Sequence, residues 1–224
     1  DNLKFIAGFG WRHSGLHEKI KEISNLHLGG NPQSIIMSGG AFGIVTNGIH
    51  FLDLAISIFN ENPKVVFSNI KSDNINPRSN DLDFWQGVSS WFFPNDKNLT
   101  ICSSNHSSVA YTIDIFCPKG KIVIEEGMES VSVYKRDDAE IENDPRVIRL
   151  GKAFKQKSLR YTPDYSRAFD NLISPLLKFD DDIIIDAVRE SIATKAIIYA
   201  IISSKLGKRL NLDEELDRSY YEKE

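Results

Sequence analysis

The chain has 224 residues, and its 41% hydrophobic and 26% charged content is typical of a soluble globular protein. A net charge of −4 leaves no basic surface of the kind that binds nucleic acid. No apolar run is long enough to span a bilayer, because Lys195 interrupts the longest candidate, residues 193–202. The two cysteines, Cys102 and Cys117, are too few for a disulfide framework and lack metal-ligand spacing. We therefore expect a cytoplasmic protein without metal, membrane segment or nucleic-acid partner.

The first 25 residues predict a short apolar strand at residues 5–9, a turn at 10–13, and a helix over 14–23 with Ser14 as its N-cap. Gly8 and Gly10 begin a dinucleotide-binding fingerprint, but its third small position holds His13 and no acidic residue follows a second strand. We reject that fingerprint. His13 and His17 lie one helical turn apart without a third ligand, so we interpret them as surface histidines.

A glycine-rich segment, residues 39–43, follows a strand predicted at 33–38 and leads into a helix that runs to Phe59. Glycine lets this backbone bend and approach another group closely. The purpose is either tight packing of the loop or room for a substrate or a nicotinamide ring. Thr46 or Asn47 is the expected helix cap. Nearly every position from 49 to 59 is apolar, which predicts a helix buried on most sides.

His50 stands in the first turn of this helix, three residues before Asp53, so the two side chains share a helix face. A helix N-terminus favours a neutral imidazole or a nearby anionic ligand. A lone histidine at such a position is more often a hydrogen-bonded structural residue than a catalyst. Spacing alone does not decide between these roles, and the catalytic hypothesis depends on the rest of the chain.

After this helix the hydrophobic period changes to two, which predicts a largely antiparallel meander. One face of the meander is apolar enough to need helices over it, so we expect an α+β fold with a large open sheet and helices on one face. The other face mixes Phe92 and Phe116 with polar residues, which favours a subunit contact and a homo-oligomer. The predicted strands are residues 64–72, 84–93, 99–105, 109–116, 121–125 and 130–134.

Residues 137–163 are charged and irregular, with one strand indicated near Val147. They include a basic cluster made of Lys152, Lys155, Lys157 and Arg160. We interpret this cluster as part of a solvated loop; the alternative is that it binds an anionic substrate. Helices are predicted at 164–177 and 181–205, and Gly207 is expected to end the second. An edge strand at 209–212 and a charged tail at 213–224 complete the chain.

Four stretches give the chain a resemblance to the glucose–fructose oxidoreductase / inositol dehydrogenase / rhizopine-catabolism (Gfo/Idh/MocA) family. They are GFGWRHSGLHEKIKEI, GIVTNGIHFLDLAISIF, WQGVSSWFFPNDKNLTICSSNHSSVAYTIDIFCPKGKIVI and SIATKAIIYAIISSKLGKRLNL. They are similar, in order, to the family's crossing strand, its Gly-x-His-x-x-Asp segment, its antiparallel meander, and its closing helix with a Ser-x-x-x-Gly tail. Together they cover most of the chain.

The resemblance implies that residues 1–25 are the remnant of a crossing strand and helix from a Rossmann domain. Residues 26–212 would then form the substrate-binding and oligomerisation domain, followed by a charged tail at 213–224. It further implies an NAD or NADP cofactor held by sequence ahead of this chain, since the glycine-rich turn and the Glu-Lys-Pro lysine of the family are not present.

The family's histidine corresponds to His50, which implies that His50 handles the proton of a substrate hydroxyl during hydride transfer. Arg12 matches the family's crossing-strand arginine and is expected to orient substrate. Inositol-dehydrogenase-like members carry aspartate where this chain has Thr46, which can bond a sugar hydroxyl but cannot hold negative charge. With Asn47, Thr46 is a candidate substrate contact. Asp53 and Gly43 are expected to be structural residues near the site.

Our leading hypothesis is the substrate-binding and oligomerisation part of an NAD(P)-dependent oxidoreductase acting on a sugar, polyol or sugar derivative. The alternative is a non-catalytic dimerising or carbohydrate-binding scaffold that has lost the dinucleotide-binding half. A third hypothesis, a plain structural α+β domain, predicts no ligand near His50, Arg12 and Asn47.

Overall fold

The computed structural model describes residues 9–40, 42–73, 83–125, 130–136, 154–160, 164–178 and 182–216. Its helices are α1 (Gly10–His13), α2 (Leu16–His27), α3 (Ile44–Phe59), α5 (Tyr165–Lys178) and α6 (Asp182–Leu206). Its strands are β1 (Ser34–Gly39), β2 (Val65–Asp73), β3 (Phe84–Phe92), β4 (Asn98–Ser103), β5 (Thr112–Cys117), β6 (Gly120–Glu125), β7 (Ser130–Lys135), β8 (Phe154–Arg160) and β9 (Leu210–Asn211).

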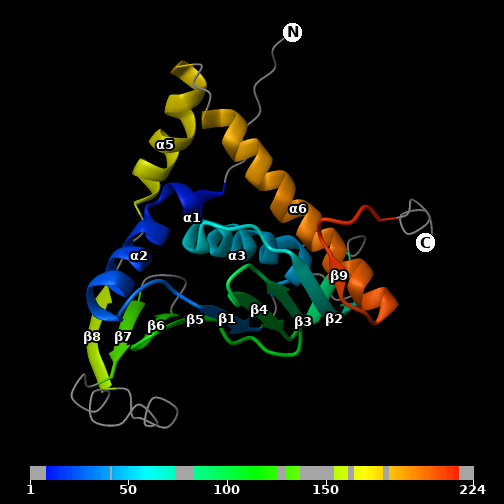
Figure 1. Ribbon diagram of the computed structural model, residues 1–224, viewed down its shortest axis with the longest axis horizontal. Coiled ribbons are helices and arrows are strands. Elements are labelled where there is room, and N and C mark those ends of the chain that lie inside the picture. Colours follow the sequence, from blue (N-terminus) through cyan, green and yellow to red (C-terminus); the bar gives the residue numbers. More distant parts are fainter. Residues whose placement is uncertain are drawn as a thin grey trace.

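The described strands form a single sheet in the order β8-β7-β6-β5-β1-β4-β3-β2-β9. All neighbouring pairs are antiparallel except β1 and β4, which run parallel. Helices α1, α2, α3 and α6 lie on one side of the sheet (Figure 1). The expected α+β fold, with a mostly antiparallel sheet and helices on one face, is therefore confirmed.

The largely antiparallel meander is interrupted at one point, because β1 lies between β4 and β5. Neighbouring strands are about 4.8 Å apart, so the connection from β4 to β5 has to cross about 10 Å. The eight residues from 104 to 111 cover that distance, and their backbone bonds to the end of β1, where the Gly40 N–H donates to the Val109 carbonyl at 2.8 Å.

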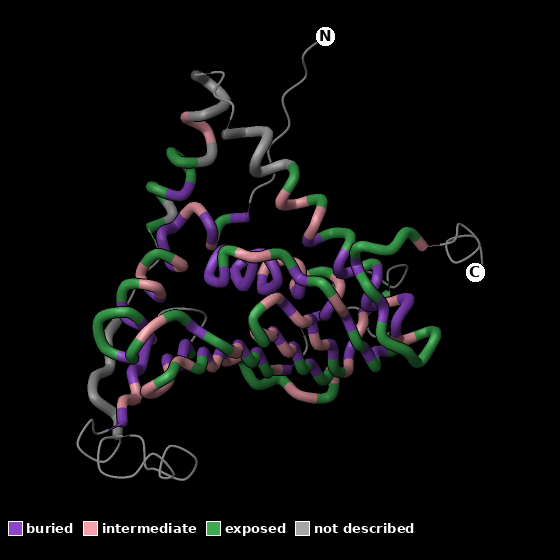
Figure 2. Tube along the Cα trace, in the orientation of Figure 1, coloured by how far each residue is buried: buried purple, intermediate pink, exposed green. Residues whose placement is uncertain are grey.

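A row of apolar residues crosses the sheet at one level and faces the helices. Cross-strand register places these residues side by side, and each is at most 3% exposed. Figure 2 shows this buried surface continuing into α3, whose burial extends over most of its length. The core therefore fills the space between the sheet and α3, as the apolar helix predicted. The row is Val66, Trp91, Leu99, Ile35, Ile115, Ile122 and Val133.

Two serines near the end of α6 hold this helix against β2. Ser203 Oγ accepts the Ser68 N–H at 3.1 Å and donates to the Lys208 carbonyl at 2.6 Å. Ser204 Oγ accepts the Ile70 N–H at 2.9 Å and donates to the Ile70 carbonyl at 2.6 Å. Gly207 then ends the helix with φ +62°, in the left-handed conformation expected for it.

Several local predictions need correction. Residues 10–13 form the short helix α1 instead of a turn, and Gly15 precedes α2 in place of Ser14, whose hydroxyl donates to the Trp11 carbonyl at 2.9 Å. The basic segment expected to be a solvated loop contains strand β8. The strands predicted at 5–9 and near Val147 lie outside the described residues, apart from Phe9, as does the tail beyond residue 216.

Candidate functional site

The segment that carries the candidate histidine begins at Gly43, the residue before α3. Gly43 has φ +71°, and a Cβ there would lie 2.5 Å from the Phe84 ring and 2.7 Å from Thr46 Oγ1. Both the conformation and the space therefore require glycine. The same geometry fixes how the chain enters α3, and so where the first turns of this helix present their side chains.

The prediction that Thr46 or Asn47 caps α3 is wrong, because Gly43 occupies the N-cap position and no side chain bonds there. Both residues lie inside the first turn and donate to carbonyls behind them. Thr46 Oγ1 bonds the Gly43 carbonyl at 3.4 Å, and Asn47 Nδ2 bonds the Phe42 carbonyl. Thr46 is exposed and Asn47 is half-buried.

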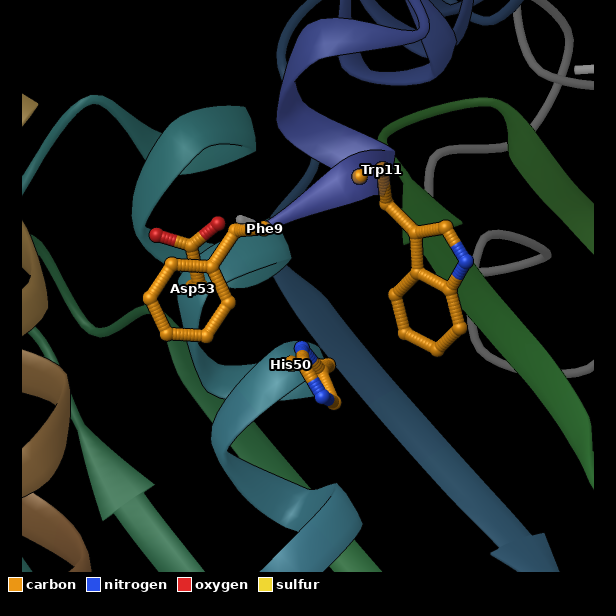
Figure 3. A pocket seen from close by; sticks show the side chains of 5 residues that line it. Phe9, Trp11, His50 and Asp53 are labelled. Carbon is orange, nitrogen blue, oxygen red and sulfur yellow. The ribbon is translucent and has the colours of Figure 1, made fainter. Parts of the chain in front are cut away.

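His50 lines a cavity of about 210 Å³ at the junction of α1 and α3, together with Phe9, Gly10, Trp11 and Asp53. Figure 3 shows the imidazole between the rings of Phe9 and Trp11. Its ring centroid lies 5.2 Å from that of Phe9 and 5.9 Å from that of Trp11, both edge-to-face. The imidazole is therefore half-buried between aromatic neighbours and lines the cavity.

The environment of His50 favours a neutral imidazole. Burial lowers the pKa of His50 below its ordinary value, because a low-dielectric surrounding disfavours the charged form, and the Asp53 carboxylate raises it in partial compensation. A neutral imidazole has a nitrogen lone pair that can accept a proton. The site can therefore provide a general base at neutral pH.

Arg12 and Asp53 form a buried ion pair at this cavity, to whose lining Asp53 contributes. Arg12 donates from Nε to Asp53 Oδ2 at 3.1 Å and from Nη2 to Oδ1, with the two side chains 6% and 1% exposed. Bidentate geometry of this kind fixes both groups strongly. The pair connects α1 to α3, so it sets the position of Trp11 relative to His50.

The glycines before α3 are explained by loop packing. A Cβ on Gly39 would lie 2.6 Å from Tyr111 Cα, and one on Gly40 would lie 2.2 Å from the Ser107 carbonyl oxygen. The chain itself occupies this space. Of the two interpretations of these glycines, the structure therefore supports tight loop packing and not a space left for a ligand. Tyr111 in turn contacts Phe51, with ring centroids 5.1 Å apart.

The structure places His50 and Asp53 together in the lining of the cavity and pairs Asp53 with Arg12, whereas Arg12, Thr46 and Asn47 are not among the residues that line the cavity. Sequence reasoning missed Phe9 and Trp11, the two aromatic walls. The signal available for them was their position on either side of Gly10, immediately before Arg12.

Within the described ranges, no group of three or more His, Cys, Asp or Glu side chains is placed to hold a metal ion. Among the helices described, none combines the length and the apolar character required to traverse a lipid bilayer.

No family model matches the chain, and no curated protein matches its sequence. Solved structures do match its fold. A super-repressor mutant of Gal80p from Saccharomyces cerevisiae is 12% identical with a TM-score of 0.65, over 96% of this chain and 67% of that one. An aldose-aldose oxidoreductase from Caulobacter crescentus, complexed with glycerol, is 15% identical with a TM-score of 0.62, over 93% and 64%.

An oxidoreductase from Agrobacterium radiobacter, in complex with NAD+, L-tartaric acid and magnesium, is 13% identical with a TM-score of 0.58, over 95% of this chain and 66% of that one. The fold is that of the Gfo/Idh/MocA-type oxidoreductases and of Gal80p. At these identities the likeness concerns fold alone. The chain spans about two thirds of the length of these structures.

Proposed function

We propose that the chain is the substrate-binding and oligomerisation part of an NAD(P)-dependent oxidoreductase that acts on a sugar, polyol or sugar derivative. The observation that carries this proposal is the His50 imidazole at the wall of an aromatic cavity, its pKa lowered by burial, on a fold shared with oxidoreductases. Two matching structures are complexes with glycerol and with L-tartaric acid, which supports a small hydroxylated substrate.

In this proposal His50 accepts the proton of a substrate hydroxyl. Oxidation of an alcohol removes hydride from carbon and a proton from oxygen, so a base near the hydroxyl lowers the barrier. A neutral imidazole meets that need at pH 7. The Arg12–Asp53 pair acts by holding α1 against α3, and Trp11 and Phe9 keep bulk water away from the imidazole.

The described turn before α3 does not supply a cradle for a dinucleotide. Pyrophosphate is usually bound by a glycine-rich turn at a helix N-terminus, with open backbone N–H groups. Here the turn before α3 is filled by residues 107–111, and the Gly40 N–H bonds the Val109 carbonyl. NAD or NADP, which would supply the hydride acceptor, is therefore assigned in this proposal to sequence outside the described ranges.

The open face of the sheet supports the oligomerisation role. Four apolar side chains on four strands are 38–43% exposed there: Ile36, Phe67, Val88 and Phe116. Neighbouring polar groups on this face already bond one another, as in Ser34 to Asn98 at 2.7 Å and Ser90 to Thr100 at 3.0 Å. A second copy of the chain could bury the apolar groups without leaving these hydroxyls unpaired.

The second candidate function is the non-catalytic scaffold, and the likeness to Gal80p favours it. Two matching structures are of Gal80p, one of them described as a transcriptional regulator, so this fold is also found in a regulatory protein. The two functions differ in what His50 contacts: an enzyme places a hydroxylated small molecule on the imidazole, whereas a scaffold has no such requirement.

The test is an NMR titration of the chain with a panel of monosaccharides, cyclitols and polyols, following the His50 ring protons assigned through His50→Gln. The oxidoreductase proposal expects saturable shifts of the His50 signals for at least one compound. Steady-state assays of the full-length protein with NAD+ and NADP+ should then show turnover of the same compound. Binding without turnover would favour the carbohydrate-binding scaffold.

A further inference from the structure

The cavity at His50 is built mainly from aromatic rings. Two of its described lining residues have ionisable side chains, His50 and Asp53, and the Asp53 carboxylate is held by Arg12. Phe9 and Trp11 supply most of the remaining wall (Figure 3). A ligand in this cavity therefore gains its binding free energy chiefly from contact with apolar surface, with His50 as its hydrogen-bond partner.

Trp11 is a fixed wall of the cavity. Its ring centroid lies 4.7 Å from that of Phe51 and 6.3 Å from that of Tyr111, so the indole is packed against residues of α3 and of the segment before β5. A ring held in this way loses little conformational entropy when a ligand binds. Trp11 is also half-buried, which leaves part of the indole available to the cavity.

Cyclic and open-chain substrates differ in the surface with which they can contact the indole of Trp11. The ring of a pyranose or a cyclitol has faces made of C–H groups, whose partial positive charge suits the negative face of an indole. An open-chain polyol has no persistent face of this kind and loses rotamer freedom on binding. Pockets for drug-sized ligands usually have volumes of about 300–1,000 Å³. The cavity at His50 is smaller, at about 210 Å³, so it suits a ligand with a single ring.

We propose that Trp11 is a specificity-determining residue that selects cyclic sugars and cyclitols over open-chain polyols by stacking on the C–H face of the ring. The inference rests on the proposed function, since it places the substrate in the same cavity. Because the centroid of the indole lies 5.9 Å from that of His50, a sugar ring stacked on the indole would lie next to the imidazole. Specificity then comes from the aromatic wall and proton handling from His50.

The test compares Trp11→Leu and Trp11→Phe with the wild-type full-length protein, using myo-inositol and glucose as cyclic compounds and sorbitol and glycerol as open-chain ones. In Trp11→Leu, kcat/KM for the cyclic compounds should fall about tenfold or more, with the open-chain values changed less than about twofold. Trp11→Phe should retain most of the preference. Equal losses for both classes in Trp11→Leu would overturn the inference and leave Trp11 a packing residue.

A second readout does not depend on hydride transfer. Ring protons of a bound cyclic sugar should shift upfield in NMR spectra when the wild-type protein is present, and this shift should disappear in Trp11→Leu. If neither the wild type nor the variants turn over substrate but this Trp11-dependent shift is seen, the proposed dehydrogenase activity is wrong and the stacking inference stands. If neither cyclic compound binds the wild type, the stacking inference is wrong. Thermal unfolding of each variant establishes that the compared proteins are folded.

Discussion

Arg12 and Asp53 meet in a buried, bidentate ion pair that links α1 to α3 across 41 residues of sequence. Two buried charges are costly to separate from water, but they compensate each other as long as both are present. The pair holds the helix that carries Trp11 against the helix that carries His50. The shape of the candidate site thus depends on an interaction next to the imidazole.

Replacing one partner of this pair should destabilise the protein strongly. Asp53→Asn removes the negative charge that the buried Arg12 guanidinium contacts at this position, and the expected loss is about 3–5 kcal/mol in the free energy of unfolding. Urea unfolding followed by circular dichroism measures it. The double variant Arg12→Met/Asp53→Leu removes both charges and should recover most of the loss. An Asp53→Asn variant as stable as the wild type would contradict the ion-pair account.

The lowered pKa of His50 makes stability depend on pH. Folded His50 has a pKa below the ordinary value of about 6.5, so between the two values the unfolded chain binds more protons. The free energy of unfolding should therefore rise with pH within that window and become level above about pH 6.5. The difference between wild type and His50→Gln, measured by urea unfolding from pH 5 to 8, isolates this contribution from that of His17, whose pKa is also lowered by burial. Parallel profiles for the two proteins would contradict it.

Gly43 should not tolerate a side chain. Gly43→Ala combines a left-handed backbone with overlap of the new methyl group and the Phe84 ring, so we expect a loss of about 1–3 kcal/mol. Gly10→Ala is the matched control, because a Cβ there would have no heavy atom within 4 Å. Thermal unfolding of both variants checks the contrast. Similar effects at the two positions would indicate that the entry into α3 adapts.

The open sheet face should contain the subunit contact. Phe67 and Val88 are both 43% exposed on neighbouring strands, and the double variant Phe67→Lys/Val88→Lys would place charge in the proposed interface. Light scattering coupled to size exclusion should show an oligomer for the wild type and a monomer for this variant. Leu26→Lys, at a site 69% exposed on α2, is the control and should remain oligomeric. A monomeric wild-type full-length protein would exclude the contact.

Period-two hydrophobicity predicted the strands well, because one face of each is buried against helices. The position of β1 between β4 and β5 could not be predicted, since neighbours in a sheet are chosen by long-range packing and β1 pairs with strands more than 60 residues away. Strand β8 was missed because the many charges of residues 152–160 were interpreted as a solvated loop.

Within the candidate site, His50 and Asp53 were expected on one face because helical spacing is local. The pairing of Arg12 with Asp53 was not expected, since no local pattern connects two residues so far apart. Thr46 and Asn47 were predicted as caps from residue type, but the positive φ of Gly43 moved the helix start ahead of them. The sequence therefore predicted which residues share a helix face, whereas the contacts between α1 and α3 could be identified only from the three-dimensional structure.

Turnover by His50→Ala in the full-length protein tests the central claim most directly. With the best substrate of the panel and saturating cofactor, loss of a positioned base should lower kcat about 10²- to 10⁴-fold, while the exposed control His27→Ala keeps the wild-type value. Wild-type turnover in a folded His50→Ala protein would contradict the claim that this imidazole handles the substrate proton.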